Sequence, residues 1–336
     1  MNGASVDSAK NRPATDPQPV AGQPQHNGNH HGNGHPAVMA EPLTSVAYQT
    51  GVAIGQTHAT AIRQWSRSVA QSSTGKSVQC VLDDQLEQQL EGIAKGAQVE
   101  AGLLRAAVAD PTLVVGTCDL LLDVPSSPAQ EKNRVRGFAM SFTRHIPMEH
   151  VSFDTNNAND QNRSSGCLVK ATGMPGAVVG WNDAGIVALL GPDASDEQPI
   201  SSGMPAGQVI EYIARRCRSF DELQQSIDRG DLERPPAGVS VLVADLSRGG
   251  VREITPRGEI QDRGNQLVCR NRISPLTRIL SGSVQQPSVG LAEVASNQSA
   301  AALSAACSWL AITINGQQAS VAGGSPAGPV PCVADF

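Results

Sequence analysis

Residues 92–124 read GIAKGAQVEAGLLRAAVADPTLVVGTCDLLLDV, and within them the sequence changes from one periodicity to another. The first part has the apolar spacing of an amphipathic helix, whereas residues 112–117 form a short apolar run typical of a buried strand. At its end stand Gly116, Thr117, Cys118 and Asp119. A glycine, a hydroxyl, a thiol and a carboxylate in succession predict either a polar loop or a nucleophile.

Helical periodicity dominates upstream of this point, and β-branched runs dominate downstream of it. Helices are predicted over residues 51–71, 83–97, 99–109, 207–217, 219–227 and 289–302. Strands broken by glycines are predicted over residues 112–117, 166–172, 176–181, 185–190, 239–245 and 251–255, with hairpin turns at 247–250 and 315–316. Helices combined with many antiparallel strands favour an α+β fold over a doubly wound parallel sheet.

The length of 336 residues allows one large domain or two small ones. Residues 1–42 are rich in Pro, Gly, Asn, Gln and His, and they are predicted to form a disordered tail because they have almost nothing to bury. Although His30, His31 and His35 could bind a metal ion, a polar tail without a ligand is the favoured interpretation. Residues 43–336 are predicted to form a single folded domain.

Composition argues against several classes of protein. The net charge of −6 and the aromatic content of 3% disfavour nucleic-acid binding, which needs basic side chains and stacking platforms. No apolar run reaches the roughly 18 residues of a membrane span, and the first residues lack the apolar segment of a signal peptide. Seven widely spaced cysteines without a CxxC pair indicate neither a disulfide framework nor a zinc site. We therefore expect a cytoplasmic protein without a membrane, metal or nucleotide cofactor, since GxGxxG and Walker loops are also absent from the sequence.

Two kinds of nucleophilic chemistry fit the side chains at hand. A Ser-His or Cys-His hydrolase needs an oriented imidazole, and outside the tail only His58, His145 and His150 could supply one. An N-terminal nucleophile needs no histidine. Cleavage of the chain before a Cys, Ser or Thr frees an α-amine whose pKa of ~7.7–8.0 suits a general base. The Gly-Thr-Cys sequence at 116–118 fits such a junction, because glycine tolerates strained backbone, although a buried inert cysteine is the competing interpretation.

Several segments resemble a known family in their order along the chain. They are GVAIGQTHATAI (51–62), LEGIAKGAQVEAGLL (90–104), GMPGAVVGWNDAGIVALL (173–190), SVLVADLSRGGVREITP (240–256), CRNRISP (269–275) and SWLAITINGQQASVAGGSPAGPVP (308–331). Together they resemble the acyl-coenzyme A:isopenicillin N acyltransferase-like cysteine hydrolases of the N-terminal-nucleophile superfamily. The resemblance covers roughly residues 46–336.

The resemblance implies an αββα sandwich and a proenzyme that cuts itself before its nucleophile. Residues 43–117 would then be a propeptide segment and residues 118–336 the main segment. It also implies action on the amide bond of a small-molecule acylated amine or peptide-like substrate. Asn182 matches a family asparagine expected to donate to the oxyanion, and Asn271 matches one expected to orient the substrate or the nucleophile. The residues alone allow a second interpretation of Asn182, as a turn residue between two strands.

The chain departs from the family pattern at three places. The family usually has Gly-Cys-Thr at the junction, so an ungapped alignment puts Thr117 at the nucleophile position and Cys118 one step later. Cys118 is the favoured nucleophile because a thiol is the stronger one, with Thr117 as the alternative. Phe138 and Ser141 stand where the family has Arg and Asp, and Arg272 replaces a His.

Three hypotheses about function follow. The first is a hydrolase or acyltransferase that acts on amide (C–N) bonds through a self-cleaved N-terminal cysteine. The second is a catalytically inactive relative that serves as a binding or structural module, because a fold can outlive its chemistry. The third is a Cys-His hydrolase that uses His145 or His150. The sequence determines neither the acyl group nor whether the protein is a homo-oligomer. Cys167 also follows a glycine, but it is interpreted as a core residue.

Overall fold

The computed structural model describes residues 45–72, 82–116, 118–124, 136–155, 164–191, 203–233, 235, 239–269, 308–315, 318–325 and 328–329. The chain divides between Leu43 and Thr44, and every described residue belongs to the part that starts at Thr44. Four predictions lie outside the described residues: the tail over 1–42, the helix over 289–302, and the site residues Thr117 and Asn271.

The helices and strands account for most of the described residues. The helices are α1 (Val46–Thr57), α2 (Ala59–Ser72), α3 (Asp84–Ala97), α4 (Ala101–Ala109), α5 (Thr112–Val115), α6 (Ala206–Arg216) and α7 (Phe220–Asp228). One sheet, called sheet A, contains β1 (Cys118–Asp123), β2 (Arg136–Phe142), β10 (Gln266–Cys269), β11 (Ser308–Asn315), β12 (Gln318–Ser325) and β13 (Gly328–Pro329). The other, called sheet B, contains β3 (Met148–Asp154), β4 (Ser165–Ala171), β5 (Val179–Asn182), β6 (Ile186–Leu190), β7 (Val241–Asp245), β8 (Val251–Ile254) and β9 (Ile260–Gly264).

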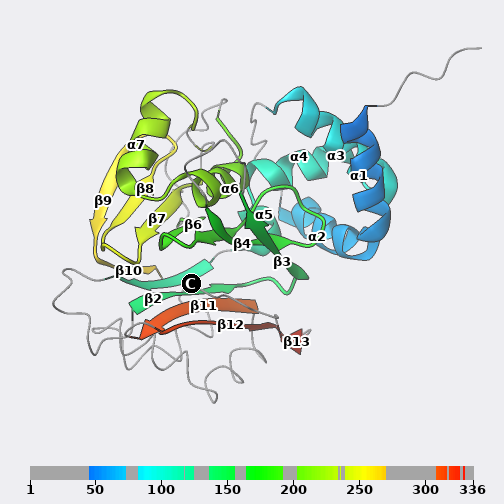
Figure 1. The fold of residues 1–336 in the computed structure, drawn as a ribbon. Coiled ribbons are helices and arrows are strands. Elements are labelled where there is room, and N and C mark those ends of the chain that lie inside the picture. The colour runs from blue at the N-terminus through cyan, green and yellow to red at the C-terminus, as the bar shows by residue number, and fades with distance from the viewer. Residues whose placement is uncertain are drawn as a thin grey trace, which may run out of the picture. The chain divides into compact units, whose positions relative to one another are not determined.

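Both sheets are antiparallel throughout. Sheet A has the strand order β10-β1-β2-β11-β12-β13, so strands from the middle and the end of the chain pair with one another. Sheet B is a meander in which β3 to β9 follow chain order. Figure 1 shows α6, sheet B and sheet A as successive layers. The predicted α+β class with stacked antiparallel sheets is confirmed, and so are the hairpins β7–β8 and β11–β12.

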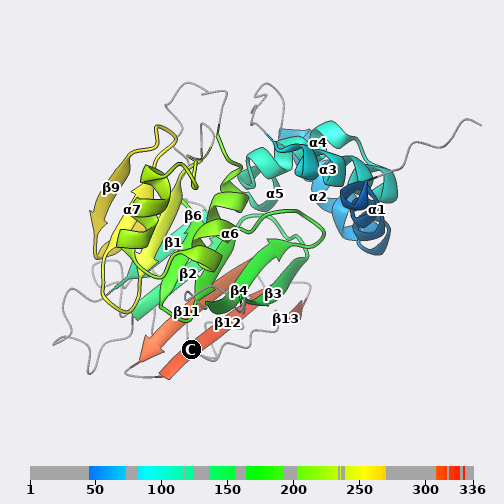
Figure 2. The same ribbon diagram turned by 45° about the horizontal axis from the view of Figure 1, so that its top comes forward.

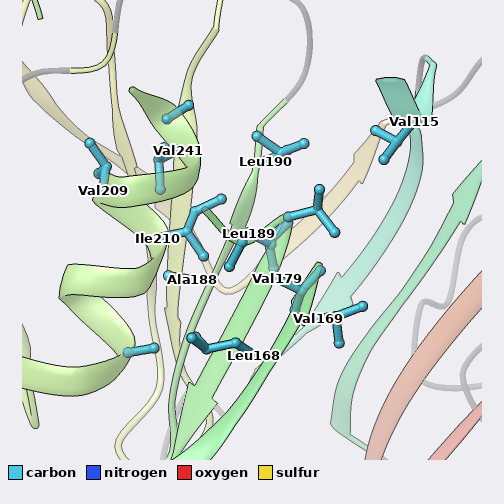
Figure 3. Close-up of a cluster of buried hydrophobic side chains, with 14 of the residues drawn as sticks. Val115, Leu168, Val169, Val179, Ala188, Leu189, Leu190, Val209, Ile210 and Val241 are labelled. Atoms are coloured by element: carbon cyan, nitrogen blue, oxygen red, sulfur yellow. The ribbon is translucent and has the colours of Figure 1, made fainter. Parts of the chain in front are cut away.

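Helix α6 covers one face of sheet B, and the other face contributes to a core shared with sheet A. A Cβ added at Gly180 of β5 would lie 2.8 Å from both the Ala214 Cβ of α6 and the Leu168 Cδ2 of β4. Side chains alternate along a strand, so the neighbours Val179 and Trp181 point away from α6. Both belong to one buried cluster that also contains side chains of sheet A. Figure 3 shows Ile210 of α6 on one side of these strands and Val115, at the end of α5, on the other.

The prediction of a strand over residues 112–117 is wrong for residues 112–115, which form the helical turn α5. The Asp110 carboxylate accepts a hydrogen bond from the Thr112 N–H at 2.9 Å, and the Val115 N–H donates to the Pro111 carbonyl at 3.0 Å. Pro111 has a φ of −60°, which favours the start of a helix. These local turn contacts therefore outweigh the strand preference of the β-branched side chains, and β1 begins only at Cys118.

The helix predicted over residues 51–71 is two helices, because the backbone of His58 leaves the helical region with φ −109° and ψ 20°. The two helices have different partners. Helix α1 packs on α3, whereas α2 contacts α4 and α5 and is tied to the β4–β5 connection by the Trp65 indole N–H, which donates to the Thr172 carbonyl at 3.1 Å. Figure 2 shows helices α1 to α4 grouped together beside the two sheets.

Candidate functional site

Gly116 joins the upstream helices to the first strand through a backbone conformation that only glycine adopts readily. Its φ of 80° and ψ of −172° lie in a region that costs other residues of order 1–3 kcal/mol. A Cβ at this position would also lie 2.1 Å from the Thr143 Oγ1, far inside van der Waals contact. Glycine is therefore required here by both conformation and space, immediately before the Thr-Cys pair singled out in the sequence.

Cys118 is the first residue of β1, where the backbone register pairs it with Phe142 of β2. Further along β1, Leu120 and Leu122 are buried in the core shared with sheet B. The other candidate nucleophile, Thr117, lies outside the described residues.

The positions at which the family resemblance expects an arginine and an aspartate lie on β2 and are buried. Phe138 is fully buried in the shared core, beside Met140 on the same face of the strand. Ser141, which pairs with Asp119 of β1, is only 2% exposed. An aromatic ring thus occupies the place expected for a guanidinium, so this position contributes packing rather than charge.

Asn182 is fully buried at the end of β5, and every hydrogen-bonding position of its amide is occupied. Its Nδ2 donates to the carbonyls of Ala214 and Cys217 at 3.0 and 2.8 Å, which ties the C-terminus of α6 to the sheet. Its Oδ1 accepts from the N–H groups of Ala184 and Ile186 at 3.1 and 3.2 Å, which fixes the β5–β6 turn. An amide has two donor hydrogens, so in this arrangement none is left for an oxyanion.

Asn182 and Cys118 lie in different sheets. Asn182 ends β5 of sheet B and shares its strand face with Gly180, the face covered by α6, whereas Cys118 begins β1 of sheet A. The interpretation of Asn182 as a turn residue therefore agrees with its observed contacts. The signal for its second role, holding α6, was absent from the local sequence because the acceptors lie 32 and 35 residues away.

Two other thiols are buried and poorly suited to nucleophilic attack. Burial raises the pKa of Cys167, which belongs to the shared core as predicted. Burial also raises the pKa of Cys217, to about 12, with a smaller opposing effect from the Ser226 hydroxyl. The thiolate is the reactive form, so both groups are inert near neutral pH. Among the described residues, no group of three His, Cys, Asp or Glu side chains is placed to hold a metal ion.

The three candidate histidines lie on different elements or connections. His58 ends α1, His145 lies in the exposed connection before β3, and His150 lies on β3 at the edge of sheet B. Burial lowers the pKa of His150, which favours the neutral imidazole. The Cys167 thiol hydrogen-bonds with the backbone of Val151 and Leu168, and the Cys217 thiol lies 4.0 Å from the Ser226 hydroxyl oxygen.

Comparisons with known proteins give a distant likeness in fold. No protein-family model matches the chain, and no curated protein sequence matches it. One similar solved structure is the Caenorhabditis elegans ortholog of N-acylethanolamine-hydrolyzing acid amidase, with 9% identity and a TM-score of 0.35 over 60% of this chain and 93% of that one. Another is a variant of conjugated bile acid hydrolase from Clostridium perfringens, with 10% identity and a TM-score of 0.26 over 49% of this chain and 56% of that one. At these scores the likeness carries no conclusion about activity. None of the described helices is long and apolar enough to cross a membrane.

Proposed function

We propose that the protein is an amide-bond hydrolase or acyltransferase that cleaves itself before Cys118 and then uses this residue as an N-terminal nucleophile. The observation that carries the proposal is the glycine-only backbone of Gly116, placed two residues before the first residue of β1. A glycine before the junction helps the chain to bend into the geometry of self-cleavage. Cys118 is favoured over Thr117 because a thiol is the stronger nucleophile.

Self-cleavage would start with attack of the Cys118 Sγ on the carbonyl carbon of Thr117. The bond from this carbon to the Cys118 nitrogen breaks, the nitrogen takes the thiol proton to become the α-amine, and a thioester forms. Water then hydrolyses the thioester to the Thr117 carboxylate and the free thiol. The new α-amine, with a pKa of ~7.7–8.0, accepts the thiol proton in the next reaction. The thiolate attacks the substrate amide, the proton passes to the departing amine, and water or an acceptor amine takes the acyl group from sulfur.

Asn182 has no part in this proposal, because its amide is engaged in the turn and in α6. Asn271 keeps the role that the family resemblance implies, the orientation of the substrate or the nucleophile. The acyl group and the acceptor are left to a substrate screen with acylated amines and short peptides.

The second candidate function is a non-catalytic module that binds a partner or has a structural role. The observation that favours it is Phe138, a fully buried ring in the core at a position where the family resemblance implies a charged group. The saturated amide of Asn182 favours it as well, since one expected oxyanion donor is lost. In that case Gly116 serves only the connection between α5 and β1.

Intact-mass measurement and N-terminal sequencing of the purified full-length chain decide between the two candidates. We expect a fragment that begins at Cys118, and we expect the Cys118→Ala chain to stay uncut. The Thr117→Ala chain is the matched control and should still be cut, because its side chain is not the nucleophile. A fragment that begins at Thr117 would instead make that residue the nucleophile. A chain that remains uncut after prolonged incubation favours the non-catalytic module.

Thiol labelling gives an independent measure of the same proposal. Iodoacetamide at pH 8 should modify Cys118 in the folded, cleaved protein, because its own α-amine promotes the thiolate. Cys167 and Cys217 should stay unmodified, since burial raises the pKa of both thiols. Peptide mapping after labelling identifies the modified cysteines. Modification of Cys217 at the rate of Cys118 would contradict this order of reactivity.

A further inference from the structure

Arg144 lies two residues beyond the end of β2 and reaches back to the segment that precedes the proposed cleavage point. Its Nη1 donates to the Leu113 carbonyl of α5, and its Nη2 donates to the Ser72 Oγ at the end of α2. Its backbone N–H donates to the Val115 carbonyl at 3.2 Å. One residue thus connects the end of β2 with two upstream helices.

Two of these three contacts satisfy carbonyls at the C-terminal end of α5. The last carbonyls of a helix have no partner inside the helix, and an arginine side chain is a common donor to them. Burial lowers the pKa of the Arg144 guanidinium and the nearby Asp110 carboxylate raises it, yet arginine keeps its charge in proteins. The guanidinium therefore provides a permanent set of donors for the turn that leads into Gly116.

The same segment also forms a wall beside Gly116. A Cβ at position 116 would meet the Thr143 Oγ1 at 2.1 Å and the Arg144 Cγ at 3.1 Å. The Gly116 N–H donates to the Thr112 carbonyl at 2.7 Å, which closes the turn from the other side. The backbone at Gly116 is consequently held between α5 and residues 143–144, in a positive-φ conformation that glycine allows.

We propose that Arg144 is the positioning residue of self-cleavage: it fixes the α5 end and thereby keeps Gly116 in its positive-φ conformation before Thr117 and Cys118. The inference rests on the proposed function for its catalytic consequence, while the restraint on the backbone can be measured separately. Arg144 touches no reacting atom, so its effect is on the geometry of the junction and not on the chemistry of the thiol.

The restraint is tested by amide hydrogen exchange in the full chain that carries Cys118→Ala, which cannot cleave through this thiol. Arg144→Met keeps the aliphatic length and removes all donors, and Arg144→Lys keeps the charge but replaces the planar fork by a single ammonium. We expect about tenfold faster exchange in peptides covering residues 112–118 for Arg144→Met, and a smaller increase for Arg144→Lys. Exchange within α1 and α3 should not change.

Arg63→Met is the matched control, because Arg63 also caps a helix end. Its Nε donates to the Ala97 carbonyl at 2.7 Å and its Nη2 donates to the Gln98 Oε1 at 3.2 Å. This variant should loosen the end of α3 and leave the junction unchanged. Unchanged exchange over residues 112–118 in Arg144→Met would overturn the inference, and so would an equal increase along the whole chain.

The catalytic consequence is tested by the rate of cleavage in chains that keep Cys118. Arg144→Met should cut more slowly by roughly ten- to a hundredfold, and added methylguanidinium should restore part of the rate by occupying the vacated site. Arg63→Met should cut at the normal rate. A normal cleavage rate in Arg144→Met would overturn the positioning role. If the unaltered chain does not cut, the proposed function fails, and the exchange experiment still decides whether Arg144 restrains the junction.

Discussion

At the scale of single residues, Asn182 joins a turn and a helix end that are far apart in the sequence. Replacing it by alanine would remove the partner of two carbonyls at the end of α6 and of two N–H groups at the β5–β6 turn, around a fully buried position. Each buried group left unpaired costs about 1–3 kcal/mol, so we expect Asn182→Ala to lower the free energy of unfolding by about 3 kcal/mol or more. Urea denaturation followed by circular dichroism measures this change.

The adjacent residue provides the control at the same scale. Asp183 lies in the same turn, but its contacts to Ser165 and Arg218, at 3.2 and 3.8 Å, are at the surface. Asp183→Asn should therefore change the free energy of unfolding by less than about 1 kcal/mol. The opposite result would be normal stability of Asn182→Ala together with a turnover reduced by roughly a hundredfold or more. That result would show that Asn182 is an oxyanion donor.

At the scale of elements, α1 and α3 pack with their backbones in contact, and glycines on both helices make this approach feasible. A Cβ at Gly92 of α3 would lie 2.1 Å from the Tyr48 carbonyl oxygen, and one at Gly51 of α1 would lie 2.2 Å from the Gln89 carbonyl oxygen. Glycine in a helix costs roughly 0.5–1 kcal/mol relative to alanine. Alanine at position 92 would recover this helix propensity, but its Cβ would force the two helices apart. We therefore expect Gly92→Ala to lower the free energy of unfolding by about 1–3 kcal/mol.

Gly102 of α4 is the matched control for this packing. A Cβ there would meet nothing within 4 Å, so Gly102→Ala gains helix propensity without a clash. Thermal unfolding should show a lower midpoint temperature for Gly92→Ala. The midpoint for Gly102→Ala should be unchanged or higher. An equal loss of stability in both variants would show that the close approach of α1 and α3 is not what requires glycine at position 92.

Elements were predictable from sequence where side-chain spacing alone decides them, as in α3 and α6, and in the hairpin between β7 and β8. Residues 112–115 misled the prediction because four β-branched and aliphatic side chains suit a strand, while the turn contacts of Asp110 and Pro111 make them a helical turn. The site was predictable only in its local part, the Gly-Thr-Cys sequence. Arg144 could not be found in this way, because its partners Leu113 and Ser72 lie 31 and 72 positions away.

At the scale of the whole described part of the chain, the helices upstream of the junction share one core with the two sheets. Trp65 of α2, Val108 of α4 and Val115 of α5 are at most 1% exposed and belong to the same buried cluster as the strands. Replacing one such aromatic side chain by alanine costs about 3–5 kcal/mol, a large share of the stability of a typical protein. The segment before Cys118 is therefore part of the folding unit.

The consequence is that cutting the chain should not separate its two segments. We expect the fragments to elute together in gel filtration after cleavage and to part only in denaturant, because apolar surface on both sides of the junction stays buried in one core. A polypeptide that begins at Cys118 should fail to fold when produced by itself, and adding the upstream segment in trans should restore a cooperative unfolding transition. Trp65→Ala in the upstream segment should weaken this association, since it removes a fully buried ring and its hydrogen bond to Thr172. A polypeptide from Cys118 onward that folds and unfolds cooperatively without its partner would show that sheets A and B form a sufficient core between them.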